Sequence, residues 1–189
     1  MLGHLPTTVE VDGVGYAVNT DYRNILRIFT AFHSEELSEE EKALVCMMRL
    51  YKNFNDIPQT DYKAAYEAAF SFIECNARED KPSPRVVNWE KDEHMIFPAI
   101  NKVAGCEVRA LPYLHWWTFL GHFQSVDHES LWGFVLSIRQ KKAKGKKLEK
   151  HEQEFFRSNG ALVLVEDRAI AQTAEDTLKA MFDSLAEEE

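Results

Sequence analysis

The side chains best suited to metal chemistry gather in the second half of the chain. His115 and His122 lie seven residues apart, which places them on one face of a helix, and His128 follows between two carboxylates. A metal site needs three or four ligands that converge at about 2 Å. The spacings typical of helical metal sites, His-Glu-x-x-His and Glu-x-x-His, are missing from the sequence. We therefore favour buried neutral histidines over metal ligands, and we predict no metal and no cofactor.

The other patterns of catalytic chemistry are weaker. There is no Gly-x-Ser-x-Gly nucleophile motif, and Gly13-Val14-Gly15 lacks the third glycine of a dinucleotide fingerprint. None of the three cysteines has a basic neighbour that would lower the pKa of its thiol. We predict that the protein is not an enzyme. The alternative is a metal-dependent enzyme with the ligands His94, His115, His122 and His128.

A basic run between residues 139 and 150 carries Arg139 and six lysines against one glutamate. It has three possible interpretations: a solvated linker between helices, a nucleic-acid site, or a contact with the acidic carboxyl-terminal part of the same chain or of another copy. The lysines lack interleaved aromatic residues for base stacking, and the whole chain has a net charge of −9. Both observations argue against nucleic acid as a partner.

Aromatic residues are abundant, with four tryptophans and twelve phenylalanines. Most of them are expected to fill a helical core, while some could anchor a protein partner. The predicted partner-binding side chains are Trp116, Trp117, Phe155, Phe156, Leu178, Phe182 and Leu185. The predicted electrostatic contacts are Lys141, Lys142, Lys144, Lys146 and Lys147.

The composition indicates a soluble, globular protein that must position these side chains. Of the 189 residues 45% are hydrophobic, and no apolar run reaches the roughly 20 residues of a membrane span. No secretory signal is readable at the amino terminus, and three scattered cysteines suit a reducing cytoplasm.

The first predicted element is a β-hairpin. Thr7 to Val11 and Val14 to Val18 alternate as strands around Asp12-Gly13, a dipeptide typical of a type I′ turn. Helical periodicity follows, beginning with a helix capped by Asn19 or Thr20. The sequence therefore predicts a mainly α-helical bundle with a small amino-terminal hairpin.

Further helices are predicted from caps and apolar spacing. Ser38 and Glu41 form a capping box before a helix whose inward side chains are expected to be Leu44, Val45, Met48 and Tyr51. Later helices are expected at 61–76, about 89–104, 112–124, 128–140, 148–158 and within 166–189. The helix at about 89–104 is expected to stop at Gly105, and Asn159-Gly160 is the expected carboxyl cap of the helix at 148–158. The pair at 112–124 and 128–140 is the predicted centre of the core.

The expected organisation has four parts within one compact domain. These are a hairpin with helices at 1–80, a proline-containing linker at 81–88, a helical unit at 89–165 and an acidic amphipathic helix at 166–189.

Several segments together resemble a family of bacteriophage proteins encoded beside the tail tape-measure gene of long-tailed phages. The resemblance covers about residues 5 to 160 and is carried by Leu5-Pro6 to Phe29, Trp89-Glu90-Lys91-Asp92, Leu114-His115-Trp116-Trp117-Thr118-Phe119, Ile138-Arg139 to Lys147, and Glu152-Gln153-Glu154-Phe155-Phe156. None of these segments is a catalytic motif, so the resemblance implies no catalytic residue.

The resemblance implies a role in virion assembly in the cytoplasm of a bacterial host, as a tail assembly chaperone. Its partners would be the apolar, helix-forming tape-measure protein and other tail assembly proteins, and it could also self-associate. The alternative within this family is a structural tail component that stays in the virion.

Overall fold

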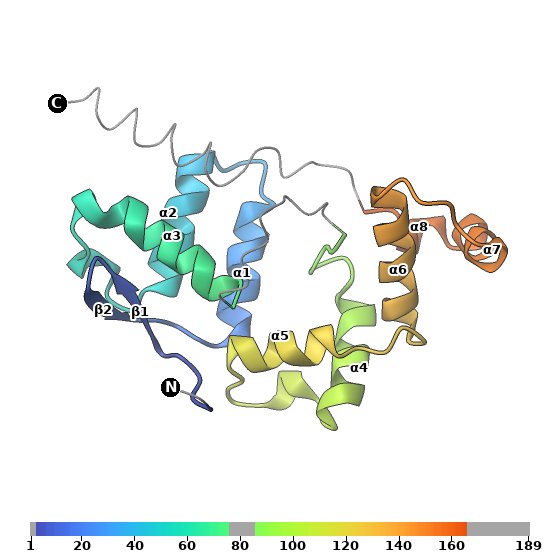
Figure 1. Cartoon of the computed structure of the whole chain (residues 1–189), viewed down its shortest axis with the longest axis horizontal. Coiled ribbons are helices and arrows are strands. Elements are labelled where there is room, and N and C mark those ends of the chain that lie inside the picture. Colours follow the sequence, from blue (N-terminus) through green and yellow to red (C-terminus); the bar gives the residue numbers. More distant parts are fainter. Residues whose placement is uncertain (1–2, 76–85, 166–189) are drawn as a thin grey trace. The chain divides into compact units, whose positions relative to one another are not determined.

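The computed structural model describes residues 3–75 and 86–165, which contain eight α-helices and one antiparallel β-hairpin (Figure 1). The prediction of a mainly α-helical fold with an amino-terminal hairpin is confirmed. None of the described helices is long and apolar enough to cross a membrane.

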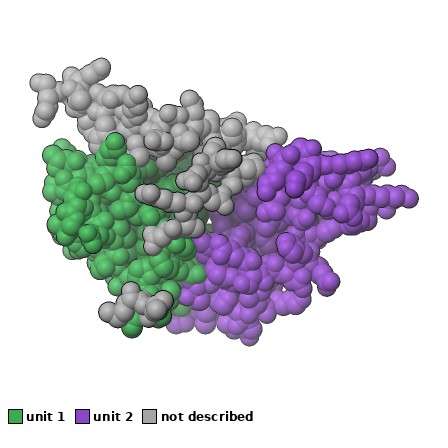
Figure 2. All heavy atoms as spheres, in the orientation of Figure 1, with its two compact units in different colours: residues 1–81, 113–117, 172–189 green, residues 82–112, 118–171 purple. Residues whose placement is uncertain are grey.

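The chain divides into two compact units, which Figure 2 colours separately. The described part of unit 1 comprises residues 3–75 and 113–117, and that of unit 2 comprises 86–112 and 118–165. The predicted linker at 81–88 lies mostly outside the described residues, as does the whole predicted helix at 166–189.

Unit 1 consists of the hairpin, three helices and the beginning of a fourth. Its elements are β1 (Thr8–Val11), β2 (Val14–Ala17), α1 (Tyr22–Phe32), α2 (Glu39–Leu50), the short 3-10 turns η1 (Phe54–Asp56) and η2 (Gln59–Asp61), α3 (Tyr62–Ile73) and the first two residues of α5 (Trp116–Gln124). α2 packs against both α1 and α3, and β1 packs against α3. The hairpin thus gains the support that two strands alone would lack in water.

The turn of the hairpin is the one that the sequence predicted. Val11 pairs with Val14, and the two residues between them, Asp12 and Gly13, have φ angles of 48° and 82°. Positive φ at both central positions is the requirement of a type I′ turn.

The amino-terminal cap of α1 differs from the prediction. Asp21, and not Asn19 or Thr20, caps the helix through a hydrogen bond from the Arg23 amide. The backbones of Asn19 and Thr20 are used elsewhere: the Asn19 amide donates to Leu50 O, and Thr20 O accepts from the Trp116 amide, each at 2.7 Å. These long-range hydrogen bonds keep the chain extended up to Asp21. Local sequence patterns do not predict them.

The buried face of α2 also differs from the prediction. The capping box of Ser38 and Glu41 is confirmed, but the helix buries Ala43, Cys46, Met47 and Leu50. Leu44 and Met48, predicted to face inward, are 38% and 56% exposed, whereas Tyr51 is buried as predicted. Residues 43–48 are all apolar, so two neighbouring stripes fit the helical period equally well and periodicity alone cannot choose between them.

Unit 2 is a helical assembly around α6. Its elements are α4 (Glu93–Ala104), the 3-10 turn η3 (Val108–Ala110), the remainder of α5, α6 (Leu131–Ala143), α7 (Lys150–Ser158) and α8 (Gly160–Val163). α6 packs against α4 and α8, and α7 packs against α8. Gly105 ends α4 in the left-handed conformation with φ of 69°, as predicted.

The helices of the second half begin later than predicted, α4 at Glu93 instead of about residue 89 and α7 at Lys150 instead of residue 148. α5 and α6 begin at Trp116 and Leu131, three or four residues later than expected, because His115 and Ser130 provide the first caps. Asn159 does end α7, but Gly160 is not part of a left-handed cap and instead begins α8.

A buried ion pair joins the segments of unit 2. Arg139 is 3% exposed, and its guanidinium group binds both carboxylate oxygens of Asp92, at 2.5 and 2.8 Å. The remaining N–H groups donate to the carbonyl oxygens of Val86, Leu162 and Val163. All five N–H donors of this side chain are therefore used, which is what a buried arginine requires. Arg139 thus does not belong to the solvated basic run, where the sequence interpretation had placed it.

Candidate functional site

An apolar stripe on α2 is the first candidate for binding a partner. Leu44 and Met48 are one helical turn apart and therefore lie on the same face of the helix. Both are exposed. Single exposed apolar side chains are ordinary on protein surfaces, but these two share a face and adjoin a hollow. We call this pair the α2 stripe.

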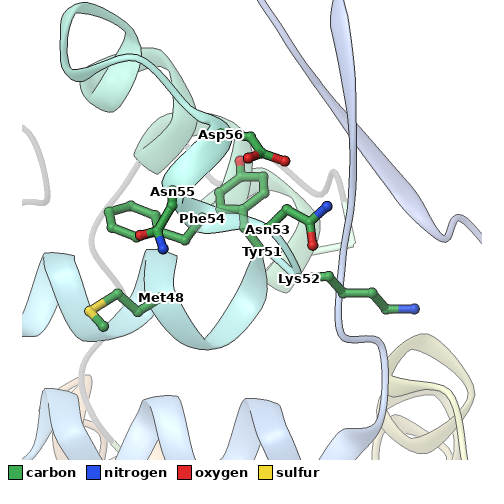
Figure 3. A pocket seen from close by; sticks show the side chains of 7 residues that line it. All are labelled: Met48, Tyr51, Lys52, Asn53, Phe54, Asn55 and Asp56. Atoms are coloured by element: carbon green, nitrogen blue, oxygen red, sulfur yellow. The ribbon is translucent and has the colours of Figure 1, made fainter.

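The hollow begins at the carboxyl end of the α2 stripe and has a volume of about 540 Å³. Its lining residues are Met48, Tyr51, Lys52, Asn53, Phe54, Asn55 and Asp56 (Figure 3). Met48 is thus common to the stripe and the hollow. Figure 3 shows the Lys52 side chain extending outward, away from the other six.

The floor of this hollow is fixed by packing and hydrogen bonds. The Tyr51 hydroxyl donates to Ala65 O of α3 at 2.7 Å, and the Phe54 ring lies 5.2 Å from the ring of Tyr62. Burial raises the pKa of Tyr51 above its ordinary value, so its hydroxyl stays protonated and keeps this hydrogen bond. The lining of the hollow is mainly polar, with amide, carboxylate and ammonium groups beside the side chains of Met48 and Phe54.

The two adjacent tryptophans of the predicted binding set serve unit 1 itself. Trp116 is 1% exposed, and its Nε1 donates to Ile73 O at 2.7 Å. Trp117 is half-buried and donates from Nε1 to Phe72 O at 2.9 Å. Both indoles therefore tie the beginning of α5 to the end of α3. Trp116 has almost no surface to offer a partner, so we do not carry it into the proposed interface.

The two phenylalanines of α7 are half-buried within unit 2. The ring of Phe155 meets that of Phe134 edge to face at 5.0 Å, and the ring of Phe156 lies 3.8 Å beneath Lys142 Nζ. The remaining predicted binding residues, Leu178, Phe182 and Leu185, lie outside the described residues.

The predicted electrostatic contacts fall into two groups. Lys141 is engaged, since its Nζ lies 2.6 Å from Glu152 Oε1 and 3.5 Å from Glu149 Oε1. Burial opposes ionisation of Glu152, but hydrogen bonds from Lys141 and from the Glu149 amide outweigh it, so the pKa of Glu152 is lowered. Lys142, Lys144, Lys146 and Lys147 are exposed.

The histidines considered as metal ligands do not converge. Among residues 3–75 and 86–165, no group of three or more histidine, cysteine, aspartate or glutamate side chains could hold a metal ion. Both ring nitrogens of His115 are occupied, because Nδ1 accepts from the Trp117 amide and Nε2 faces Pro6 O at 2.9 Å. This pairing places the proton on Nε2 and makes the ring a helix cap.

Two of the cysteine thiols, those of Cys46 and Cys75, have raised pKa values. Burial raises the pKa of the Cys46 thiol to about 12 and that of Cys75 to about 11. Raised values keep the nucleophilic thiolate scarce at neutral pH.

Sequence reasoning placed Leu44 and Met48 on one apolar face of α2 but assigned that face to the core, and it missed the Asp92–Arg139 pair. The ion pair joins residues 47 positions apart, and no local spacing indicates it.

A family model described as Bacteriophage Gp15 protein matches residues 1–161. No curated protein and no solved structure matches the chain.

Proposed function

The chain belongs to the bacteriophage Gp15 protein family, and on that premise we propose that it is a non-enzymatic tail assembly chaperone that binds the tape-measure protein during tail morphogenesis. The family places the protein among phage proteins. The chaperone role and the tape-measure partner rest on the resemblance of the sequence segments described above and on the surface chemistry of unit 1.

The single observation that carries the proposal is the α2 stripe with its adjoining hollow. A tape-measure chain is long, apolar and helical, so it exposes surfaces that aggregate unless another protein covers them. In helix-in-groove binding, one helix presents apolar anchors spaced by one turn to an apolar groove of its partner. Leu44 and Met48 have that spacing, and both are exposed.

The net charge of −9 supports the same role. A chaperone that covers an apolar partner must keep the complex in solution, and like charges on many complexes repel one another. We place this activity in the cytoplasm of the bacterial host, where tails assemble.

Co-expression with the tape-measure protein of the same phage tests the proposal. We expect a soluble complex on gel filtration, and loss of most of the soluble tape-measure protein with the variant Leu44→Lys/Met48→Lys. The matched control is Leu131→Lys, since Leu131 is 50% exposed but lies in unit 2.

A tape-measure protein that stays insoluble with the wild-type chain would refute the chaperone role. If the complex forms and the chain is also found by mass spectrometry in purified virions, the protein is a structural tail component instead.

A further inference from the structure

The hollow at the end of α2 contains polar side chains that the described residues leave without partners. Asn53, Asn55 and Asp56 line it, and all three are exposed. Neither the two side-chain amides nor the carboxylate forms a hydrogen bond or an ion pair with a residue that the structure describes. These groups are therefore available to a ligand.

The carboxyl end of α2 borders the same hollow. The last four carbonyl groups of a helix need partners from outside its regular pattern, and three of those of α2 accept hydrogen bonds from described groups. The fourth belongs to Met48, because the Lys52 amide, its usual donor, binds Ala17 O at 2.9 Å instead. A helix end with an unsatisfied carbonyl carries a partial negative charge. This end of the helix thus adds to the negative charge of Asp56.

The cations nearest to the hollow do not neutralise it. Lys52 is the positively charged member of its lining, and its side chain extends outward (Figure 3). Arg49 is exposed in the last turn of α2 but is not part of the lining. Neither side chain forms an ion pair with Asp56 within residues 3–75 and 86–165. The hollow therefore favours a positively charged ligand.

Apolar groups lie beside these acceptors. The Phe54 ring and the Met48 side chain line the hollow, whose volume of about 540 Å³ lies within the roughly 300–1,000 Å³ typical of ligand sites. An aromatic ring attracts a cation over its face, and a flat, weakly hydrated cation stacks on it best. We propose that the hollow binds the guanidinium group of an arginine from the helix that docks on the α2 stripe.

The chemistry of arginine matches this lining more closely than that of other ligands. A guanidinium group has five N–H donors and no acceptor, so it can bind the Asp56 carboxylate and amide oxygens together. A lysine ammonium is compact and strongly hydrated and does not stack on a ring. An anionic ligand would meet the negative charge of Asp56 and of the helix end.

The source of the arginine follows from Met48, which belongs to both the α2 stripe and the hollow. A helix that covers Leu44 and Met48 brings its next turn beside the hollow, since residues one turn apart share a face. The source of the arginine therefore rests on the proposed function, whereas the affinity of the hollow for guanidinium does not.

Titration of the ¹⁵N-labelled full chain with n-butylguanidinium tests the site, with amide chemical shifts as the measurement. We expect shifts centred on residues 52–56 and an affinity several-fold weaker in Asp56→Asn, because a charge-assisted hydrogen bond is lost. The matched control is Glu67→Gln, which removes an exposed carboxylate of α3 outside the hollow and should bind as the wild type does. Lys52→Gln should bind at least as tightly as the wild type.

Three results would overturn the proposal: no shifts at residues 52–56, an equal response to n-butylammonium or butyrate, or an unchanged affinity of Asp56→Asn.

Co-expression with the tape-measure protein tests the source of the arginine. Asp56→Asn should lower the yield of soluble complex several-fold, and Glu67→Gln should not. Equal yields from the two variants would overturn an arginine supplied by the partner. A wild-type chain that binds n-butylguanidinium but forms no complex would refute the chaperone role and support the guanidinium site.

Discussion

Arg139 and Asp92 show what a single buried pair does in this molecule. The arginine binds the carboxylate and three carbonyl oxygens from two distant segments, so it joins the chain before α4 to α6 and α8. Because a buried charge is tolerated only with its partners, removal of either side chain leaves the other uncompensated.

We expect Arg139→Met to lower the free energy of unfolding by about 3–5 kcal/mol, since Asp92 would stay buried without its counter-charge. Urea denaturation measures this loss. The double variant Asp92→Leu/Arg139→Met removes both charges, so it should be less destabilised than the sum of the single variants. Simple additivity would show that the two side chains act independently.

Glu107 gives a prediction about acid. Hydrogen bonds from the Arg109 side chain, and then from its amide and from Asn101, lower the pKa of the Glu107 carboxyl from 4.5 to about 2. A lowered pKa in the folded state means that the carboxylate stabilises the fold above about pH 4.5 and loses this effect as the pH falls toward 2. The stability advantage of the wild type over Glu107→Gln should therefore shrink between pH 5 and pH 2, as measured by denaturation at each pH. An advantage that stays constant over this range would contradict the assignment.

At the scale of elements, close backbone approach decides how α6 begins. Ser130 Oγ accepts from the Gly133 amide, and a Cβ at Gly133 would lie 2.2 Å from Asp127 O and 2.8 Å from His128 Cα. Only glycine fits this position without movement of the preceding loop. From the sequence alone, Gly133 is recognisable only as a poor helix former within a predicted helix.

Two glycine-to-alanine variants should therefore have opposite effects. Gly133→Ala should destabilise the protein by about 1–3 kcal/mol, because the added methyl group overpacks the turn. Gly121→Ala in α5 should stabilise it by about 0.5–1 kcal/mol, because no atom lies within 4 Å of the new Cβ and alanine is the better helix former. Thermal denaturation of both variants checks the signs, and a shared sign would show that the backbone contact is unimportant.

At the scale of the whole molecule, the three thiols report on different depths of the fold. Cys46 is buried in α2 of unit 1, Cys75 is partly exposed after α3, and Cys106 is exposed in unit 2. In native protein a thiol reagent should label Cys106 first, Cys75 more slowly, and Cys46 only after unfolding of unit 1. Mass spectrometry of the labelled peptides gives the order. Rapid native labelling of Cys46 would contradict the packing of α2.

Local patterns in the sequence were sufficient to predict features that depend only on interactions between neighbouring residues. The type I′ hairpin, the capping box of Ser38 and Glu41, and the stop of α4 at Gly105 each depend on a few adjacent residues, and the structure confirms all three. The helical fold class follows from the same short-range periodicity.

Tertiary structure decided the features that depend on residues far apart in the chain. Asp21 caps α1 because the backbone groups of Asn19 and Thr20 form hydrogen bonds with residues far away in the sequence. In α2, Met47 is buried and Met48 is exposed because packing within unit 1 selects one of two apolar faces. Arg139 is buried because Asp92 and three carbonyl groups converge on it. Burial and long-range hydrogen bonds are properties of the assembled chain, so a one-dimensional pattern can suggest candidates but cannot choose among them.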